Sequence, residues 1–468
     1  MIGSLSNIFR IPDLRKKIFY TAALLTVFRL GAHVPIPFID PNELAKFMAG
    51  LSGLAGGVFS FINMFSGGAF KQMTVFSFGI MPYISASIIL QLLTIVWPYL
   101  ERLSKEGEAG RKKINQYTRY GTVAIAMFQA FGLSMVMLKQ GLVSIPDYKF
   151  LFILTTMVSV TAGTCFIMWL GEKITEKGIG NGISLIIAIG ILASYPFDIA
   201  FSIKQVQSGV LRPIWIPTVL VLMVAVSALI ILIQQGQRKI PIQHAKRVVG
   251  RKVTQGGTTY LPLRINTAGV IPVIFASSIM MFPSTIFGFF GEGDPTSLWT
   301  RMSSWLGYNS PYNLHTLLTP ESGGILLLLK CINIYTIVDS LMVAFFCFFY
   351  TAIVFNPTDT AENLRKYGAF IPGKRPGKPT AEYIDFVLTR ITLVGAIFLV
   401  VVALVPKIIQ SSFQSVPYQL AQMAGGTGLI IVVGVMLDTM KKIESSLLMR
   451  HYDGFMKSGR KAARKGRW

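Results

Sequence analysis

The chain has 468 residues, of which 52% are hydrophobic and 14% charged, and its formal net charge is +23 at pH 7. This composition excludes a soluble multidomain protein, a disordered chain, a coiled coil and a nucleic-acid-binding module, because each of these needs far more charged surface. We therefore expect a membrane protein. Cys165, Cys331 and Cys347 lie in or beside apolar runs without a CxxC spacing, so we expect buried thiols.

Apolar segments of membrane-spanning length recur along the chain. A helix that crosses the hydrocarbon core needs about 20 mostly apolar residues. Runs of roughly this length predict ten transmembrane helices, the fifth and tenth of them short. These segments are 18–37, 75–97, 118–138, 150–171, 182–195, 213–234, 267–290, 334–355, 384–406 and 425–440.

One apolar stretch before the second segment is too short to cross. Residues 61–73 read FINMFSGGAFKQM and are broken by Gly67 and Gly68. We expect a re-entrant half-helix packed against protein, because irregular backbone cannot face lipid. Pro82, Pro272 and Pro283 are interpreted either as ordinary kinks or as interruptions that line a pathway.

The basic residues predict the orientation in the membrane. An even number of spans places both termini on one side, and 33 of the 44 Lys and Arg residues fall on that side. The termini are therefore predicted to be cytosolic. Topology and attraction to anionic lipids explain part of this excess. Loop 235–266, however, has seven basic residues and no acid, with a hairpin tip predicted at Gly256-Gly257, and it indicates a docking surface for an anionic partner such as ribosomal RNA or an acidic protein face.

Deep intramembrane charges are few. Only Arg29 and Asp339 lie well inside the predicted spans, and no acidic residue is predicted near the midplane. That pattern disfavours the main alternative, an ion-coupled secondary transporter with inverted repeats. Residues 368–375 spell GxxxxGK but have Arg375 where a phosphate loop needs Ser or Thr, and HExxH and GxSxG are absent. We therefore expect no enzyme activity, no cofactor and no metal site.

Several long stretches of the chain closely resemble the SecY family, the central channel subunits of the bacterial protein translocase. They are NMFSGGAF and GIMPYISASIILQLLT (63–94), KEGEAGRKKINQYTRYGT (105–122), WLGEKITEKGIGNGIS (169–184), LPLRINTAGVIPVIFASS (261–278), FFCFFYTAIVFNP (345–357) and GAFIPGKRPGKPT (368–380), with FRLGAHVPIP and GGTGLIIVV extending the resemblance to the first and last segments.

The resemblance implies an all-α membrane protein with ten transmembrane helices in two inverted five-helix halves around an hourglass pore, with a re-entrant plug helix. The implied division is an N-terminal half 1–195, a hinge 196–212, a C-terminal half 213–440 with cytosolic loops 235–266 and 356–383, and a basic tail 441–468. It also implies a passive protein-conducting channel of the bacterial inner membrane, which passes unfolded secretory polypeptides and releases hydrophobic segments sideways into lipid.

The resemblance also assigns residues to parts of this channel. The pore ring is Ile80, Ile84, Ile187, Ile274 and Ile431. The plug, about 61–73, includes Phe61, Asn63, Met64, Phe65, Ser66, Gly67 and Gly68. The lateral gate is Ser85, Ser87, Gln91, Phe128, Gln129, Ser277, Ser278 and Phe282. Apolar side chains around a narrow neck would dewet it and block ions. The polar gate residues are interpreted either as interhelical hydrogen-bond donors and acceptors or as a seam that opens.

The partners are implied in the same way. The motor ATPase SecA and the ribosome would dock on Arg238, Lys239, Lys246, Arg247, Arg251, Lys252, Lys374 and Arg375, with Arg375 as the main basic residue of the second loop. The small membrane subunits SecE and SecG, unfolded preproteins, signal peptides and anionic lipids are the other implied partners. The resemblance does not explain the long external stretch 291–333, Asp339 or the basic tail.

Overall fold

A computed structural model describes residues 11–50, 62–144, 146–244, 247–249, 252–254, 257–290, 333–413 and 416–465. The chain forms two compact units. Unit 1 comprises Met1–Asp198, Met281–Asn309 and Val435–Trp468, and unit 2 comprises Ile199–Met280 and Ser310–Gly434. The predicted Phe61 of the plug, Lys246, Arg251, Cys331 and most of stretch 291–333 lie outside the described residues.

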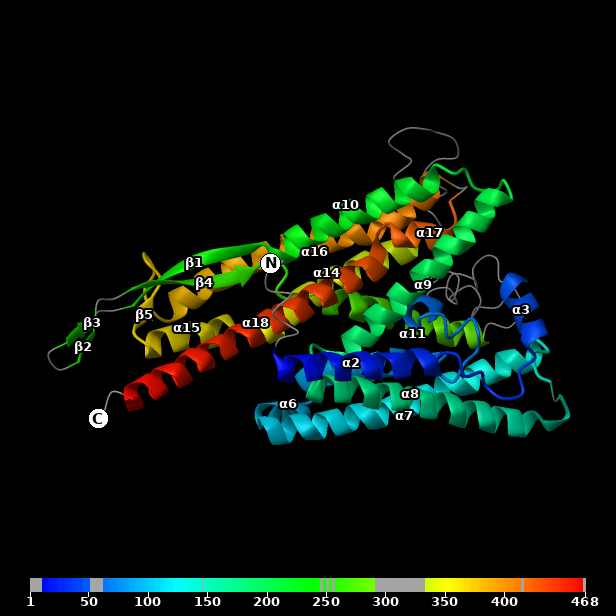
Figure 1. Ribbon diagram of the computed structural model, residues 1–468, viewed down its shortest axis with the longest axis horizontal. Helices are drawn as coiled ribbons and strands as arrows, with labels where there is room; N and C mark the ends of the chain where they lie inside the picture. Colours follow the sequence, from blue (N-terminus) through cyan, green and yellow to red (C-terminus); the bar gives the residue numbers. More distant parts are fainter. Residues whose placement is uncertain are drawn as a thin grey trace. The chain divides into compact units, whose positions relative to one another are not determined.

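The described residues are mostly helical (Figure 1). The helices before residue 208 are α2 (Pro12–Gly31), α3 (Pro41–Gly50), α5 (Met81–Val96), α6 (Pro98–Lys105), α7 (Glu108–Lys139), the short 3-10 helix η1 (Pro146–Tyr148), α8 (Lys149–Lys177) and α9 (Gly182–Gln207). The later helices are α10 (Trp215–Gln235), α11 (Ile271–Phe290), α14 (Ile334–Val354), α15 (Pro357–Lys366), α16 (Lys378–Ser412), α17 (Tyr418–Met423) and α18 (Gly426–Lys465).

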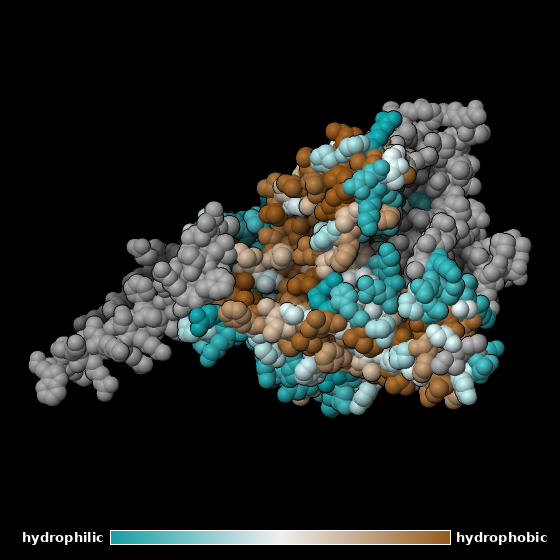
Figure 2. All heavy atoms as spheres, turned by 45° about the vertical axis from the view of Figure 1, so that its right-hand side comes forward, coloured by the Kyte–Doolittle hydropathy of each residue, from teal (hydrophilic) through white to brown (hydrophobic). Residues whose placement is uncertain are grey.

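Each of the ten predicted segments coincides with a helix. In the described part of the chain, seven helices are long and apolar enough to cross a membrane, and there are eight if α5 and α6, which are bent by 100° relative to each other, are counted as one span. Segments one and seven coincide with α2 and α11. Apolar side chains cover much of the surface seen in Figure 2, as expected for helices whose solvent is lipid.

Two of the three predicted interruptions are instead helix starts. Pro82 and Pro272 are each the second residue of their helix, α5 and α11. Proline is favoured there because its missing N–H would have no partner in the first turn. Gly79, with φ of +54°, ends the preceding turn, so α5 begins at Met81 and not at residue 75. Only Pro283 lies within a helix, α11.

The short fifth and tenth segments belong to longer helices. α9 continues past Pro196 to Gln207, so the predicted hinge 196–212 is helical over most of its length. The non-helical connection to α10 is confined to residues 208–214. α18 likewise continues from the tenth segment into the basic tail as far as Lys465.

Unit 1 has a core built by α7, α8 and the segment that precedes α5. Ile62, Phe70, Met73 and Phe78 pack in one buried cluster with Leu133 and Met137 of α7 and Phe152 and Val160 of α8. α5 packs closely on α7, where a side chain added at Gly121 would lie 3.4 Å from Ala86 Cβ. The plug segment is thus anchored by the apolar side chains at its two ends.

Unit 2 contains a sheet formed by the cytosolic loops of the prediction. β1 (Gln237–His244) pairs antiparallel with β4 (Thr258–Arg264) on one side and β5 (Ala369–Phe370) on the other (Figure 1). Its apolar face packs on the start of α16: the cluster is Ile240, Leu263, Ile371, Ile384 and Val387. The two loops are therefore one folded body.

The predicted hairpin tip is wrong. β2 (Arg247–Val249) pairs with β3 (Lys252–Thr254), and Val249 is opposite Lys252. The chain therefore reverses between these two residues and not at Gly256-Gly257. The physical reason is that Val248 and Val253 favour strand pairing beyond the end of the β1–β4 ladder, which extends the hairpin.

Candidate functional site

The plug segment ends its helical turn with two glycines in left-handed conformation. Gly67 and Gly68 have φ of +67° and +90°. The Gly68 N–H donates to the Asn63 carbonyl at 2.9 Å, and the Gly67 N–H donates to the Met64 carbonyl at 3.3 Å. This pair of bonds is a Schellman motif, which only residues tolerant of positive φ can form cheaply. The sequence NMFSGG is thus a helix stop signal.

Side chains of the plug segment close the turn that follows. Asn63 Oδ1 accepts from the Lys71 backbone N–H at 2.9 Å, and Ser66 Oγ accepts from the Phe70 N–H at 3.1 Å. Phe65 and Ser66 are buried, whereas Asn63 and Met64 are half-buried. The segment therefore has a fixed internal structure and leads directly into α5.

Two elements of unit 1 contact the plug segment at Gly67. Arg29 of α2 donates from Nη1 to the Gly67 carbonyl at 2.8 Å. On α9, Gly190 lies so close that a side chain at Gly67 would come within 2.8 Å of the Gly190 Cα. The absence of a side chain at Gly67 allows this backbone-to-backbone approach.

The five predicted pore-ring isoleucines are all buried. Ile80 is the N-cap residue of α5, and Ile84 lies one turn later, its N–H donating to the Ile80 carbonyl at 3.1 Å. With Ile187 of α9 they belong to unit 1. Ile274 of α11 and Ile431 of α18 belong to unit 2. The ring as a whole stays a prediction.

The predicted gate residues differ in burial. Ser85, Gln129, Ser277 and Ser278 are buried, Ser87 and Gln91 are half-buried, and the Phe282 side chain lies outside the described residues. Gln91 Nε2 donates to Ser87 Oγ at 3.3 Å within α5, and Ser278 Oγ donates to the Ile274 carbonyl at 2.8 Å. Phe128 is 45% exposed, so it points away from its buried neighbour Gln129 on α7.

Two buried side-chain atoms of the predicted gate residues have no hydrogen-bond partner among the described residues. They are Gln129 Oε1 and Ser277 Oγ. Because a buried polar atom without a partner is costly, each of these two groups is a candidate to bind water or another polar group.

The predicted docking residues with described side chains are exposed. Arg238 and Lys239 lie on β1, and Lys374 and Arg375 on the loop between β5 and α16. The loop is ordered by its own contacts: Thr380 Oγ1 donates to the Arg375 carbonyl at 2.7 Å, and the Lys374 ammonium lies 5.4 Å from the centre of the Tyr383 ring. Arg247 and Lys252 lie on β2 and β3, and nothing is described of their side chains.

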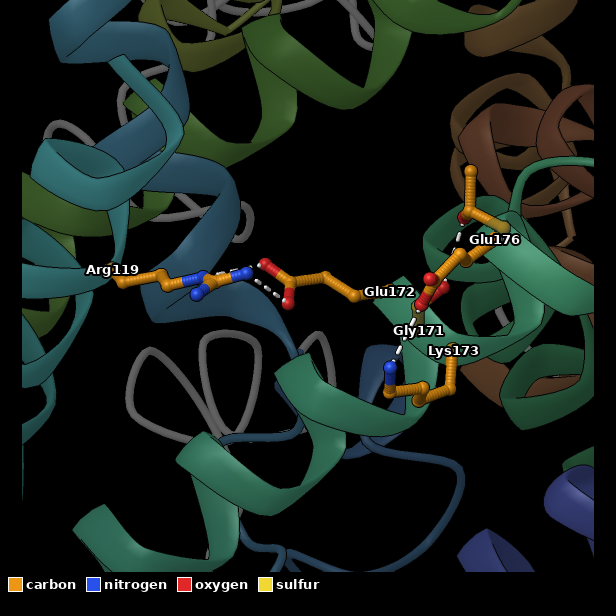
Figure 3. Close-up of polar contacts among 6 residues, drawn as sticks. Arg119, Gly171, Glu172, Lys173 and Glu176 are labelled. Atoms are coloured by element: carbon orange, nitrogen blue, oxygen red, sulfur yellow. Dashed lines mark hydrogen bonds and ion pairs between the residues drawn. The ribbon is translucent and has the colours of Figure 1, made fainter. Parts of the chain in front are cut away.

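An ion pair that sequence reasoning missed joins two of the family-like stretches (Figure 3). Arg119 of α7 donates from Nε and Nη2 to the two carboxylate oxygens of Glu172 on α8, at 2.9 and 2.7 Å. Neighbouring Lys173 pairs within its own helix with Glu176 at 2.7 Å. No spacing rule predicts a pairing across 53 residues, so the structure was needed to find it.

Asp339, which had no explanation in the sequence, belongs to a buried polar cluster in unit 2. Asp339 and Lys407 are each 8% exposed, and the Lys407 charge acts on the Asp339 carboxylate. Lys407 Nζ donates to Thr336 Oγ1 at 2.6 Å and lies 4.3 Å from the centre of the Tyr335 ring. The cluster joins α14 to α16.

The fold and the re-entrant segment define a multi-pass membrane protein with the fold of a protein-conducting channel. The chain resembles the solved structure described as "The structure of a protein conducting channel", with a TM-score of 0.60, 16% identity and coverage of 92% of this chain and 91% of that one. It also resembles Sec61 in the canine ribosome-channel complex from the endoplasmic reticulum, with a TM-score of 0.58, 15% identity and coverage of 92% and 91%.

The sequence places the chain more narrowly. The SecY family model matches residues 74–440. The protein translocase subunit SecY of Streptomyces galbus is 44% identical over 470 residues, covering 98% of this chain and all of the relative. The SecY subunit of Escherichia coli K12 is 44% identical over 449 residues, covering 95% and 94%. The chain belongs to the SecY family.

Proposed function

We propose that this chain is the pore subunit of a protein translocase, which passes unfolded secretory polypeptides across a membrane and releases hydrophobic segments sideways into it. The observation that carries the proposal is the similarity to translocase subunits over almost the whole chain. The fold neighbours are described as channels, and the plug segment packs in the core of unit 1.

The site residues receive distinct roles in this proposal. The five ring isoleucines form the narrow neck, because apolar side chains exclude water yet bind no particular peptide tightly. The plug segment closes the neck on its outer side. The polar gate residues of α5, α7 and α11 form the seam through which an apolar helix leaves for lipid, to which it partitions by its own hydrophobicity.

The partners and location complete the proposal. The channel is passive and lies in a bacterial inner membrane with both termini cytosolic, and SecE and SecG are its membrane partners. SecA or the ribosome docks on the sheet β4-β1-β5 and the adjoining Arg375 loop, and it drives transport from this position. The exposed basic side chains there support this docking, because they suit an anionic surface. Related channels have been seen bound to ribosomes.

A crosslinking experiment tests the pore. A photo-crosslinking residue replaces Ile84, a secretory precursor is stalled midway, and attachment of the precursor is measured in membranes. Ile397 of α16, which is 56% exposed, is the matched control because it is an isoleucine facing lipid. Attachment at position 84 and not at 397 is expected. No attachment in an intact, partner-bound complex would contradict the proposal.

A further inference from the structure

Arg29 is a charge in an unusual place. It lies on α2 within the first predicted span, where an arginine is costly unless a partner satisfies it. Its side chain is half-buried, and the partner of Nη1 is the Gly67 carbonyl at 2.8 Å. The cation in the first span is thus bonded to the backbone of the plug segment.

The Gly67 carbonyl is well suited to receive this bond. The Schellman motif uses the carbonyls of Asn63 and Met64, so the Gly67 carbonyl lies beyond the closed turn. The end of a helix also carries partial negative charge, which favours a nearby cation. A charged donor makes a stronger hydrogen bond than a neutral one.

The position of Gly67 depends on α9. The plug turn rests against the α9 backbone because Gly67 has no side chain, which would otherwise come within 2.8 Å of the Gly190 Cα. Arg29 therefore contacts the plug turn from α2 while α9 supports it. Both contacts exist only while the plug segment lies in this position.

We propose that Arg29 is the latch of the plug: its hydrogen bond to the Gly67 carbonyl stabilises the closed position and must break before the plug leaves. Arg29 is a positioning residue, and it sets how strongly an arriving polypeptide must bind to open the channel. Because its side chain is only half-buried, water can solvate the guanidinium after release. The inference rests on the proposed channel function and adds the residue that controls its resting state.

The test measures how often the plug is exposed. Met64→Cys is introduced after Cys165, Cys331 and Cys347 are changed to Ala, and labelling by a membrane-impermeant maleimide is timed from the outer face. Arg29→Met removes the donor and Arg29→Lys keeps the charge with a shorter reach. Arg15→Met is the matched control, because Arg15 is exposed on the same helix.

We expect Arg29→Met to raise the labelling rate by roughly tenfold, the usual loss for a hydrogen bond from a charged donor. Arg29→Lys should give a smaller rise, and Arg15→Met should leave the rate unchanged. If Arg29→Met fails to assemble, the labelling rate of Arg29→Lys is the deciding measurement. A labelling rate equal to that of the parent protein would overturn the proposal that Arg29 is the latch.

A stalled precursor separates the two proposals. Suppose that Arg29→Met is labelled at the parent rate while the stalled precursor still raises labelling in both the parent protein and Arg29→Met. The proposal that Arg29 is the latch would then be wrong, whereas the proposed channel function would stand. The channel proposal itself fails if the precursor changes labelling in neither protein and does not crosslink at position 84.

Discussion

Arg119 and Glu172 form a two-bond ion pair between α7 and α8, so two helices of unit 1 are joined by a planar contact with a fixed orientation. Arginine suits such a contact because its rigid fork matches a carboxylate. The contact is partly exposed, with 51% and 27% of the side chains accessible, so solvent screens it. The pair fixes orientation more than it adds stability.

Breaking this pair should therefore have a small effect. We expect Arg119→Gln and Glu172→Gln each to destabilise the protein by less than about 1 kcal/mol, as for other exposed pairs. The charge-swapped double variant Arg119→Glu with Glu172→Arg should recover part of this loss. Thermal unfolding of purified protein in detergent measures it. Lys105→Gln, which breaks a more exposed pair with Glu101, is the control and should change less.

Gly67→Ala should weaken the closed state. The substitution adds a side chain at a φ of +67° and within 2.8 Å of both Arg29 Nη1 and Gly190 Cα. The left-handed conformation alone costs about 1–2 kcal/mol. We expect greater passive ion leak through the channel in planar bilayers. Gly190→Ala meets only ordinary contacts of 3.4 Å and longer, so an equal leak from that variant would refute the explanation.

Asp339 and Lys407 are both buried and interact electrostatically, so we expect substitutions at the two positions to be coupled. Removing one partner leaves a buried charge, which typically costs about 3–5 kcal/mol, whereas replacing both is often close to neutral. Asp339→Asn and Lys407→Met should each lower yield and unfolding temperature. The double variant should be more stable than the sum of the two losses. Strict additivity in a double-mutant cycle would show that the charges do not interact.

Polar residues in the predicted ring should loosen the closed channel. Ile84→Ser and Ile274→Ser replace apolar surface with a hydroxyl that wets the neck. We expect higher ion leak and export of precursors with weak signal peptides. Ile89→Ser is the control because Ile89 lies on α5 and is 44% exposed. Unchanged leak and unchanged signal discrimination in both ring variants would count against the ring.

Reversal of charge at Arg375 should block export without preventing assembly. The Arg375 side chain is exposed, while its carbonyl is fixed by Thr380, so the substitution changes the surface and not the loop. We expect Arg375→Glu to lose most preprotein export in inverted membrane vesicles. Arg102→Glu, an exposed arginine on α6, is the control for a general change in surface charge. Normal export by Arg375→Glu would refute docking at this loop.

The helices could be predicted because apolar length is a local property. The ten apolar runs each mark a helix, and the NMFSGG sequence marked a break, because glycines at positive φ act within a few residues. Proline was ambiguous: Pro82 and Pro283 look alike in the sequence, yet one begins a helix and the other lies inside one. The left-handed conformation of Gly79, which ends the turn before α5, distinguishes Pro82 as a helix start, and this conformation is seen only in the structure.

Pairings across long distances could not be predicted. The Arg29 bond to Gly67 spans 38 residues and depends on where α2 and the plug turn meet. Arg29 and Asp339 were recognised as unusual because charges are rare in lipid, but their partners were not. The pairing of β5 with β1 was also missed, because a two-residue strand has no recognisable sequence pattern.

The sheet β4-β1-β5 has a mechanical consequence. Gln243 and His244 of β1 pair with Phe370 and Ala369 of β5, so the two loops cannot move independently without breaking main-chain bonds. The sheet is linked through short connections to α10, α11, α15 and α16. A force applied by a partner at Arg375 would therefore move the sheet as one rigid body and displace the ends of several helices together. Two loops that were not paired would bend separately and transmit less of the same force to the helices.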